Sequence, residues 1–407
     1  MSLTSDYLEY VQPLKGSSHY HRWSILSVVS SLLERRVWLD RGRLGVLFPN
    51  TYTILVGGPA TGKSTAAGLA VELINSVRAK NRLPPYIGPS KVTQAALYED
   101  FLKATRGVLS HTSDGETKQS PMFIYASELA VSMNDFGGGT LTNELIDFYD
   151  SKGIDITIQK KTISGGLLSI PNPSITLLAG TTPEYLQGAS ADQIINSGLA
   201  SRIVFVVERT HPDKEWSPVP VDLRLKQSII NQLSKVYCMS GKMSLSPAAQ
   251  AFYVENAKTA DKAGFGSRTS FHQNYFGRKP DHICKLSMAF AAQRGSFTIE
   301  PEDLATAIEW LEEIEPDMIR AFGSRAINKD TDLAKQLIQY IPDAPGEIEK
   351  GDMLVKLMLD GKFLPLNGDF EATLKGMVES DVVKKKGLNG STKEFYSRTK
   401  RAKALYE

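Results

Sequence analysis

One short run of residues has the composition of a loop that binds phosphate groups. Glycines allow backbone N–H groups to face a β-phosphate, a lysine neutralises the β and γ oxygens, and a hydroxyl can bind Mg²⁺. An apolar segment precedes this run and a helical pattern follows it. The run reads Gly57-Gly58-Pro59-Ala60-Thr61-Gly62-Lys63-Ser64-Thr65. The sequence therefore predicts a site for ATP with Mg²⁺, in which Lys63 is catalytic and Ser64 is a metal ligand.

Polar residues follow two further apolar segments and could complete this chemistry. Glu128 comes just after residues 122–126, where a carboxylate can orient an attacking water, although an acid at a strand end is often only solvated. Ser127 stands where an aspartate usually helps to hold magnesium, so we expect the metal to depend mainly on Ser64 and the phosphates. Thr181 and Thr182 follow residues 174–179, and one of them is expected to sense the γ-phosphate.

Two arginines are candidates for stabilising the charge that develops during phosphoryl transfer. Arg202 precedes the apolar segment 203–207 and could act on a nucleotide held by a neighbouring subunit; the alternative is a surface salt bridge. Arg278 is expected to open a helical run over 280–290, from where it could reach the phosphates, or it is an ordinary helix-end cation.

Lysines at two places could contact nucleic acid. Alternation over 154–159 and 167–170 around Gly165 and Gly166 predicts a β-hairpin that carries Lys160 and Lys161. Basic residues outnumber acidic ones from residue 381 onward, and this region includes the run Lys384-Lys385-Lys386. Both groups could instead be solvated surface charge.

The elements that must position these residues follow an α/β pattern. Continuous apolar runs predict buried parallel strands at 52–56, 122–126, 174–179 and 203–207, with polar residues at their ends, where open α/β sheets bind ligands. The expected domains are an N-terminal helical segment (1–50), an ATPase core (51–220), an all-helical lid (221–327) and a winged-helix-like DNA-binding domain (328–407). In the last of these we expect helices at 333–341, 350–359 and 369–380, followed by a basic strand.

Composition agrees with an ordinary globular protein of more than one domain. The chain has 407 residues, of which 42% are hydrophobic and 23% charged, and its formal net charge of +2 does not identify a partner. No apolar run approaches the ~20 residues of a membrane span, so a cytoplasmic location is expected. Cys238 and Cys284 are expected to be buried thiols.

In this order the motifs resemble the AAA+ ATPases, in the branch with a hairpin before the third polar strand end. That branch includes the minichromosome maintenance and viral superfamily III helicases. The resemblance is closer still to the ATPases of phage and mobile-element replication proteins found beside primases. It covers residues 20–325 and is carried by 159–164, 174–183 and 199–202, together with Phe48-Pro49-Asn50, Arg278 and Lys285-Leu286.

The resemblance assigns a role to each candidate residue. It implies that Gly57 to Thr65 form the Walker A loop, that Glu128 closes Walker B, and that Thr181 or Thr182 is sensor 1. Arg202 would then be the arginine finger and Arg278 sensor 2. Ser127 departs from the usual aspartate and threonine from the common sensor asparagine, which would be compatible with slow hydrolysis.

The resulting hypothesis is a ring-forming, ATP-dependent DNA helicase or translocase for replication of a phage or mobile element. The ring would be a homo-oligomer, a hexamer by resemblance, with single-stranded DNA in its pore. A primase or other replication proteins would be separate partners. One alternative is a helicase loader or replication initiator that binds DNA and remodels a partner without unwinding. Another is a DNA-binding regulator in which ATP binding drives assembly.

Overall fold

The computed structural model divides the chain into two compact units, Met1–Phe322 and Gly323–Glu407. It describes residues 3–14, 17–81, 86–88, 94–109, 116–129, 140–150, 153, 156–161, 167–187, 198–208, 220–265, 270–359, 367–379, 381–387 and 394–399. Each unit has its own hydrophobic core and is described by itself.

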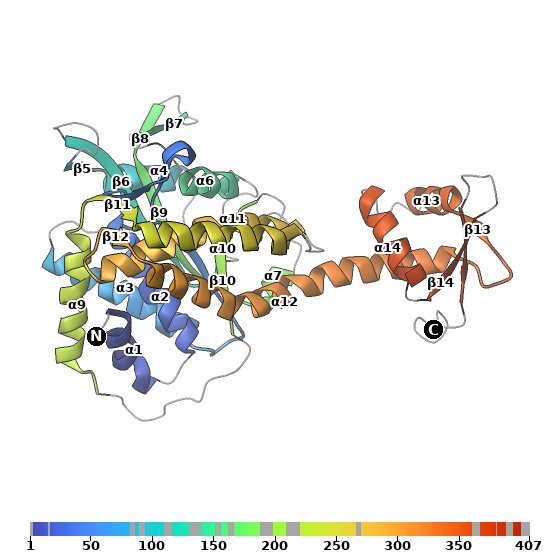
Figure 1. Cartoon of the computed structure of the whole chain (residues 1–407), viewed down its shortest axis with the longest axis horizontal. Coiled ribbons are helices and arrows are strands. Elements are labelled where there is room, and N and C mark those ends of the chain that lie inside the picture. Colours follow the sequence, from blue (N-terminus) through green and yellow to red (C-terminus); the bar gives the residue numbers. More distant parts are fainter. Residues whose placement is uncertain are drawn as a thin grey trace. The chain divides into compact units, whose positions relative to one another are not determined.

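A parallel sheet forms the centre of the first unit (Figure 1). Its strand order is β10-β3-β9-β6-β4. The strands are β3 (Tyr52–Val56), β4 (Tyr86–Gly88), β6 (Glu116–Ala126), β9 (Pro173–Thr181) and β10 (Ile203–Val207). Every residue of β3, β9 and β10 is buried, as expected for parallel strands covered on both faces. The α/β class and the strands predicted at 52–56, 122–126, 174–179 and 203–207 are therefore confirmed.

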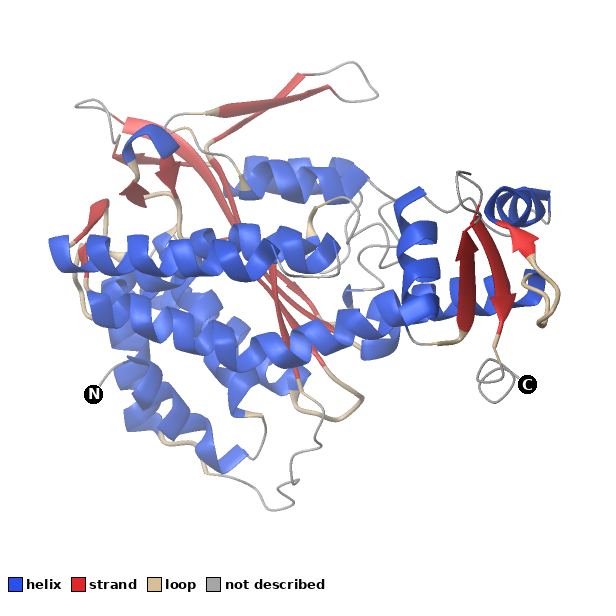
Figure 2. Cartoon of the chain, turned by 45° about the vertical axis from the view of Figure 1, so that its right-hand side comes forward, coloured by secondary structure: helices blue, strands red, loops and turns tan. Residues whose placement is uncertain are grey.

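Helices cover both faces of this sheet, and Figure 2 shows the strands enclosed between them. Alternate residues of β3 belong to different cores: Leu55 to one, Ile54 and Val56 to the other. The Leu55 side packs on helices that include α2 (Ser18–Leu33), α3 (Lys63–Lys80) and α9 (Leu223–Tyr237), with α1 (Leu3–Val11) against α2 and α9. The Ile54 side packs on α4 (Gln94–Ala104) and α6 (Thr140–Tyr149).

A second, smaller sheet joins two segments that the sequence had assigned to separate helical regions. Its order is β12-β11-β1-β2, with β1 (Val37–Asp40), β2 (Val46–Leu47), β11 (Gly241–Leu245) and β12 (Thr298–Ile299). Helices α10 (Pro247–Phe265), α11 (Ser270–Gln293) and α12 (Pro301–Tyr340) complete this part of the chain. The prediction of an all-helical lid over 221–327 is wrong, because 241–245 alternates in burial and pairs in parallel with β1.

Two β-hairpins extend from the strands of the central sheet. The first pairs β5 (Arg106–Leu109) with the beginning of β6, and the sequence analysis missed it. The second pairs β7 (Thr157–Lys161) with β8 (Leu167–Pro171), which confirms the predicted hairpin, although Gly165 and Gly166 lie outside the described residues. Figure 1 shows both hairpins at the same end of the unit.

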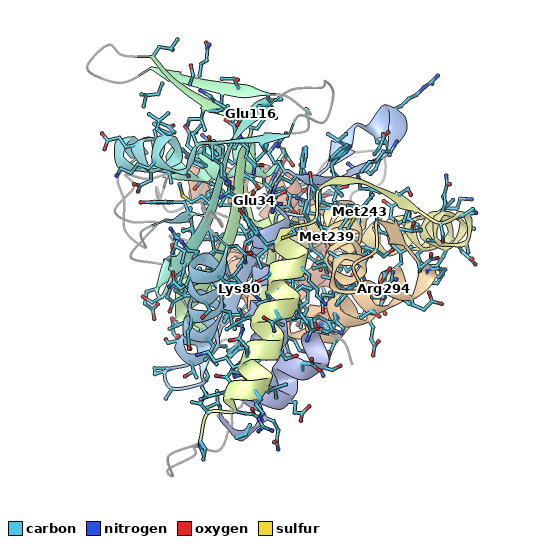
Figure 3. The ribbon with its side chains drawn as sticks, turned by 90° about the vertical axis from the view of Figure 1, so that its left-hand side faces the viewer. Glu34, Lys80, Glu116, Met239, Met243 and Arg294 are labelled. Carbon is cyan, nitrogen blue, oxygen red and sulfur yellow. The ribbon has the colours of Figure 1, made fainter. Side chains whose placement is uncertain are left out.

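A buried carboxylate fixes the base of the β5–β6 hairpin. Glu34 follows α2 with a φ of 53° and is 1% exposed. It accepts hydrogen bonds from Arg36, Arg106 of β5 and Gln119 of β6. In Figure 3 Glu34 lies among the packed elements, while Glu116, where β6 begins, lies farther out. The hairpin is thereby tied to the end of α2.

The second unit contains helices and a small antiparallel sheet. Its helices are α13 (Lys350–Leu359) and α14 (Asn367–Glu379), with the last part of α12; the sheet has the order β13-β15-β14. The strands are β13 (Ile348–Glu349), β14 (Val383–Gly387) and β15 (Glu394–Arg398). The helix predicted at 333–341 is not separate, because α12 continues from Pro301 to Tyr340.

Short helical turns complete the described elements: η1 (Gln12–Leu14), η2 (Gly42–Leu44), α7 (Pro183–Gln187) and η3 (Ala200–Arg202). Among the helices of the described ranges, none combines the length and the apolar character that a membrane crossing needs. Cys284 is buried as expected. Cys238, which directly follows α9, is exposed, so the prediction of a buried thiol was wrong for this residue.

Candidate phosphate-binding site

The glycine-rich loop lies between the end of β3 and the start of α3. Gly62 caps the helix with a φ of 93°, and Ala60 also has a positive φ, of 62°. The Thr61 hydroxyl donates to the carbonyl of Gly58 at 2.9 Å, which holds the turn closed. The loop therefore leads into the N-terminus of an 18-residue helix, whose N–H groups and dipole favour an anion.

Gly57 has no room for a side chain. A Cβ built there would lie 2.3 Å from the Tyr20 hydroxyl and 2.9 Å from Thr61 Oγ1. Tyr20 itself donates to the carbonyl of Val56 at 2.6 Å. The first glycine of the loop is thus required by close packing against α2, a contact that sequence analysis could not foresee.

Lys63 points back along the loop. Its Nζ donates to the carbonyls of Gly57 and Gly58 at 2.5 and 2.7 Å, and the residue is 8% exposed. Burial lowers the pKa of Lys63, while the charges of Glu128 and Glu184 act in the opposite direction. The residues after it, Ser64 and Thr65, are exposed on the first turn of α3.

The ends of β6 and β9 lie beside this loop. Gly57 N donates to the carbonyl of Thr181 at 3.2 Å, because Val56 pairs with Thr181 at the strand ends. A Cβ on Gly180 would lie 2.6 Å from the carbonyl of Ser127 and 3.9 Å from Cε of Lys63. Ser127 and Glu128 are exposed where β6 ends. The structure therefore brings Lys63, Ser127, Glu128 and Thr181 to one edge of the sheet.

The two threonines differ in their surroundings. Thr181 is fully buried, and its Oγ1 has no hydrogen-bond partner among the described residues. Thr182 is half-buried. A buried hydroxyl beside the phosphate loop can bond to a ligand that enters the site, so Thr181 has the more suitable position of the two.

The oxygen donors at this edge that could reach a metal are hydroxyls. The described residues contain no group of three His, Cys, Asp or Glu side chains that could hold an ion. Ser64, on the first turn of α3, and Ser127, at the end of β6, are both exposed. Mg²⁺ in nucleotide sites takes few protein oxygens and completes its shell with phosphates and water, which fits this donor set.

The start of α2 forms one side of the loop, and sequence analysis did not identify it. Ser17 Oγ donates to Glu208 Oε2 at 2.8 Å, and His19 lies 3.8 Å from the same carboxylate. Glu208, which follows β10, donates its backbone N–H to the carbonyl of Val56 at 2.8 Å. Glu208 is far in the sequence from Ser17 and His19, and these residues carry no motif, so only the fold brings them together.

Both candidate arginines lie at the opposite edge of the sheet. Arg202 precedes Ile203, which pairs with Tyr52 at the start of β3, about 13 Å from the loop at a rise of ~3.3 Å per residue. Arg202 is 8% exposed and donates to Gly198 O at 2.7 Å. Neither it nor Arg278 is placed by the structure beside the glycine-rich loop of the same chain.

A single carboxylate binds the two arginines. Asp150 accepts from Arg202 Nε at 3.0 Å and from Arg278 Nη1 and Nη2 at 2.6 and 3.0 Å. Burial alone would raise the pKa of Asp150, but the hydrogen bonds from both arginines lower it. Arg278 lies inside α11 rather than at its start, since the helix begins at Ser270.

Two residues noted with the family resemblance contact each other at this edge. Lys285 of α11 is buried and donates to the carbonyl and Oδ1 of Asn50 at 2.9 and 2.7 Å. Its Nζ lies 3.8 Å from the ring centroid of Tyr149. Burial lowers the pKa of Lys285 to about 7. The pair joins α11 to the start of β3.

The lysines considered for nucleic acid are placed at two separate elements. Lys160 and Lys161 end β7 and pair with Leu168 and Leu167. In the second unit the described side chains of Lys384, Lys385 and Lys386 are exposed on β14. Lys385 pairs with Glu394 at 2.5 Å and Lys386 with Glu347 at 2.9 Å, so part of this basic run is neutralised locally.

Comparison of the chain with models of protein families gave no match, and comparison with curated proteins likewise gave none.

Proposed function

We propose that the chain is a P-loop ATPase of the AAA+ type that moves along DNA as a ring of identical subunits. The observation that carries the proposal is the meeting of three strand ends at one edge of the sheet. The glycine-rich loop follows β3, Thr181 ends β9 beside it, and Glu128 follows β6. A helicase or translocase acting in the replication of a phage or mobile element is the function that this site and the motif order favour.

Each residue at this edge has a role in hydrolysis under the proposal. Lys63 neutralises the β- and γ-phosphates, and backbone N–H groups of 57–65 bind them. Glu128 orients a water for attack on the γ-phosphorus, and Thr181 donates its hydroxyl to the γ-phosphate. Ser64, with a weaker contribution from Ser127, would hold Mg²⁺, which would neutralise phosphate charge when bound.

The positions of the two arginines support the hypothesis that a second subunit completes the site. Arg202 and Arg278 share Asp150 at the edge that lies opposite the loop, so they cannot serve the nucleotide of their own chain in this arrangement. In a head-to-tail ring this edge of one subunit would face the loop of the next. Arg202 as arginine finger, with Arg278 beside it, would then stabilise the transferring phosphoryl group.

The DNA contacts are proposed for the β7–β8 hairpin and the C-terminal unit. Lys160 and Lys161 lie at the far end of β7, and the exposed run 384–386 lies on β14 of a unit with three helical segments and an antiparallel sheet. Cations of this kind bind phosphates without sequence preference. The proposal includes DNA binding by residues 328–407 in the manner of a winged-helix domain.

The test is ATP turnover with and without single-stranded DNA, measured together with unwinding of a forked duplex. Wild type is compared with Lys63→Ala and with Lys160→Ala/Lys161→Ala. We expect Lys63→Ala to abolish turnover, because the phosphates lose their main cation, and the double variant to keep basal turnover but lose the response to DNA. Turnover per chain should rise with protein concentration if the site needs two subunits.

The outcomes separate the proposal from its main alternative. Turnover that ignores DNA, with no unwinding, would refute the helicase and favour a helicase loader or initiator that remodels a partner. Absence of turnover in the wild type would favour the regulator in which ATP binding alone drives assembly.

A further inference from the structure

The β7–β8 hairpin is fastened to the rest of the unit at Asn172. This residue stands between Pro171, which ends β8, and Pro173, which begins β9, and it is 5% exposed. Its φ of 42° lies in the left-handed region, which asparagine adopts more readily than most residues. The chain turns here from the hairpin into the central strand of the sheet.

All four hydrogen-bonding groups of Asn172 are used, and they face two different elements. Toward Ile156, the residue directly before β7, its N–H donates to Ile156 O at 2.8 Å and its Oδ1 accepts from Ile156 N at 2.9 Å. Toward β6, its carbonyl accepts from Ser120 N at 3.3 Å and its Nδ2 donates to Lys118 O at 2.9 Å. The side-chain amide therefore bridges the base of one hairpin to the strand that forms the other.

Strand β6, which Asn172 contacts at Lys118 and Ser120, is itself held in place by hydrogen bonds to Glu34. Lys118 and Ser120 flank Gln119, which donates to Glu34, and Arg106 of the opposing strand donates to the same carboxylate. Asn172 thus attaches the β7–β8 hairpin to a hairpin that is held on the end of α2. The strand that follows Asn172 is buried throughout and ends nine residues later at Thr181, beside the glycine-rich loop.

We infer that Asn172 is a positioning residue that holds the β7–β8 hairpin in register with the nucleotide-binding edge. This rests on the proposed function, in which the hairpin contacts DNA. The left-handed backbone conformation of Asn172 and the hydrogen bonds of its side chain contribute separately to holding the hairpin. A glycine at 172 keeps the first and removes the second, and an aspartate keeps the acceptor for Ile156 N but loses the donor to Lys118 O.

The experiment compares full-length wild type with Asn172→Gly and Asn172→Asp. The first readout is hydrogen–deuterium exchange of the free protein. We expect exchange in 157–161 and 167–171 to increase in Asn172→Gly, while the amides of β3 keep wild-type protection. The second readout is ATP turnover. Basal kcat and the KM for ATP should stay at wild-type values, whereas stimulation by single-stranded DNA should be lost in Asn172→Gly and reduced in Asn172→Asp.

Asp381→Gly is the matched control. Asp381 also has a positive φ, of 56°, but it lies in the C-terminal unit on the turn before β14. It should leave exchange of the β7–β8 hairpin and basal ATP turnover unchanged, which separates the lost bridge from a general effect of glycine on the chain.

Two results would overturn the inference. Wild-type exchange of the hairpin in Asn172→Gly would show that the bridge does not hold it, and a parallel loss of basal turnover would show a merely structural role. Faster hairpin exchange in Asn172→Gly, together with wild-type ATP turnover that does not change when DNA is added, would instead refute the proposed function. The positioning role of Asn172 would then remain in place.

Discussion

At the scale of single residues, the site depends on how closely the loop packs against α2. Gly57 is a glycine because the Tyr20 hydroxyl occupies the space of its Cβ, and that hydroxyl is held by Val56 O. The same carbonyl also accepts from Glu208 N, so it keeps a partner if the tyrosine hydroxyl is removed. This allows the steric argument to be tested by a compensating change.

We predict that Gly57→Ala destabilises the fold by about 1–3 kcal/mol, the usual effect of overpacking, and weakens ATP binding. Removing the clashing oxygen in Gly57→Ala/Tyr20→Phe should recover part of both losses, while Tyr20→Phe alone should have a small effect. Thermal unfolding and ATP titration measure the two quantities. Equal defects in the single and the double variant would contradict the packing argument.

At the scale of elements, α11 carries the polar side chains that face η3, α6 and the start of β3. His282 is buried, with Nε2 2.9 Å from Ser201 O and Nδ1 3.4 Å from the Tyr149 hydroxyl. Burial lowers its pKa from 6.5 to about 4. Because the imidazole cannot readily accept a proton in the folded state, this helix is a point at which acid should weaken the fold.

The direction of this effect follows from proton binding. Above pH 6.5 His282 is neutral in both states, and between pH 6.5 and about 4 only the unfolded chain takes up the proton. The unfolding free energy should therefore fall as the pH falls through this window, by up to about 3 kcal/mol from this group. Denaturant unfolding of wild type and His282→Gln across pH 4–7 measures it.

The variant should show a shallower dependence on pH than the wild type. His21 is also buried, with its pKa lowered to about 4, so His21→Gln/His282→Gln should be shallower still. Identical slopes in all three proteins would mean that neither histidine is kept neutral by the fold.

At the scale of the whole molecule, the two compact units have separate hydrophobic cores. Phe123 is buried in the core of the first unit and Phe370 in that of the second. Residues 323–407, which make up the second unit, contain no tryptophan, whereas Trp23, Trp38 and Trp310 lie among the described residues of the first. Independent cores are expected to unfold in separate transitions, and tryptophan fluorescence should follow only one of them.

We predict two calorimetric transitions, each sensitive to one core. Phe123→Ala should lower the unfolding free energy of the first unit, whose transition tryptophan fluorescence reports, by about 3–5 kcal/mol. Phe370→Ala should lower the unfolding free energy of the second unit alone by a similar amount. A single transition that both substitutions shift equally would show that the units unfold together.

The sequence by itself determined the local parts of the site. The glycine-rich loop, the apolar strands at 52–56 and 203–207 and the β7–β8 hairpin were predictable, because loop chemistry and apolar patterning are properties of neighbouring residues. The strands of the second sheet were missed, since β11 is short and is stabilised by pairing with β1, about two hundred residues earlier in the chain.

Only the tertiary structure decided which distant residues meet. Asp150 joins Arg202 to Arg278, Tyr20 fills the space beside Gly57, and Asn172 connects two hairpins. None of these contacts follows from spacing along the chain, because the register of a sheet and the packing of its helices set them. The residue types at the site could be identified from the sequence. The edge of the sheet on which each residue lies could not, because strand order and direction set it.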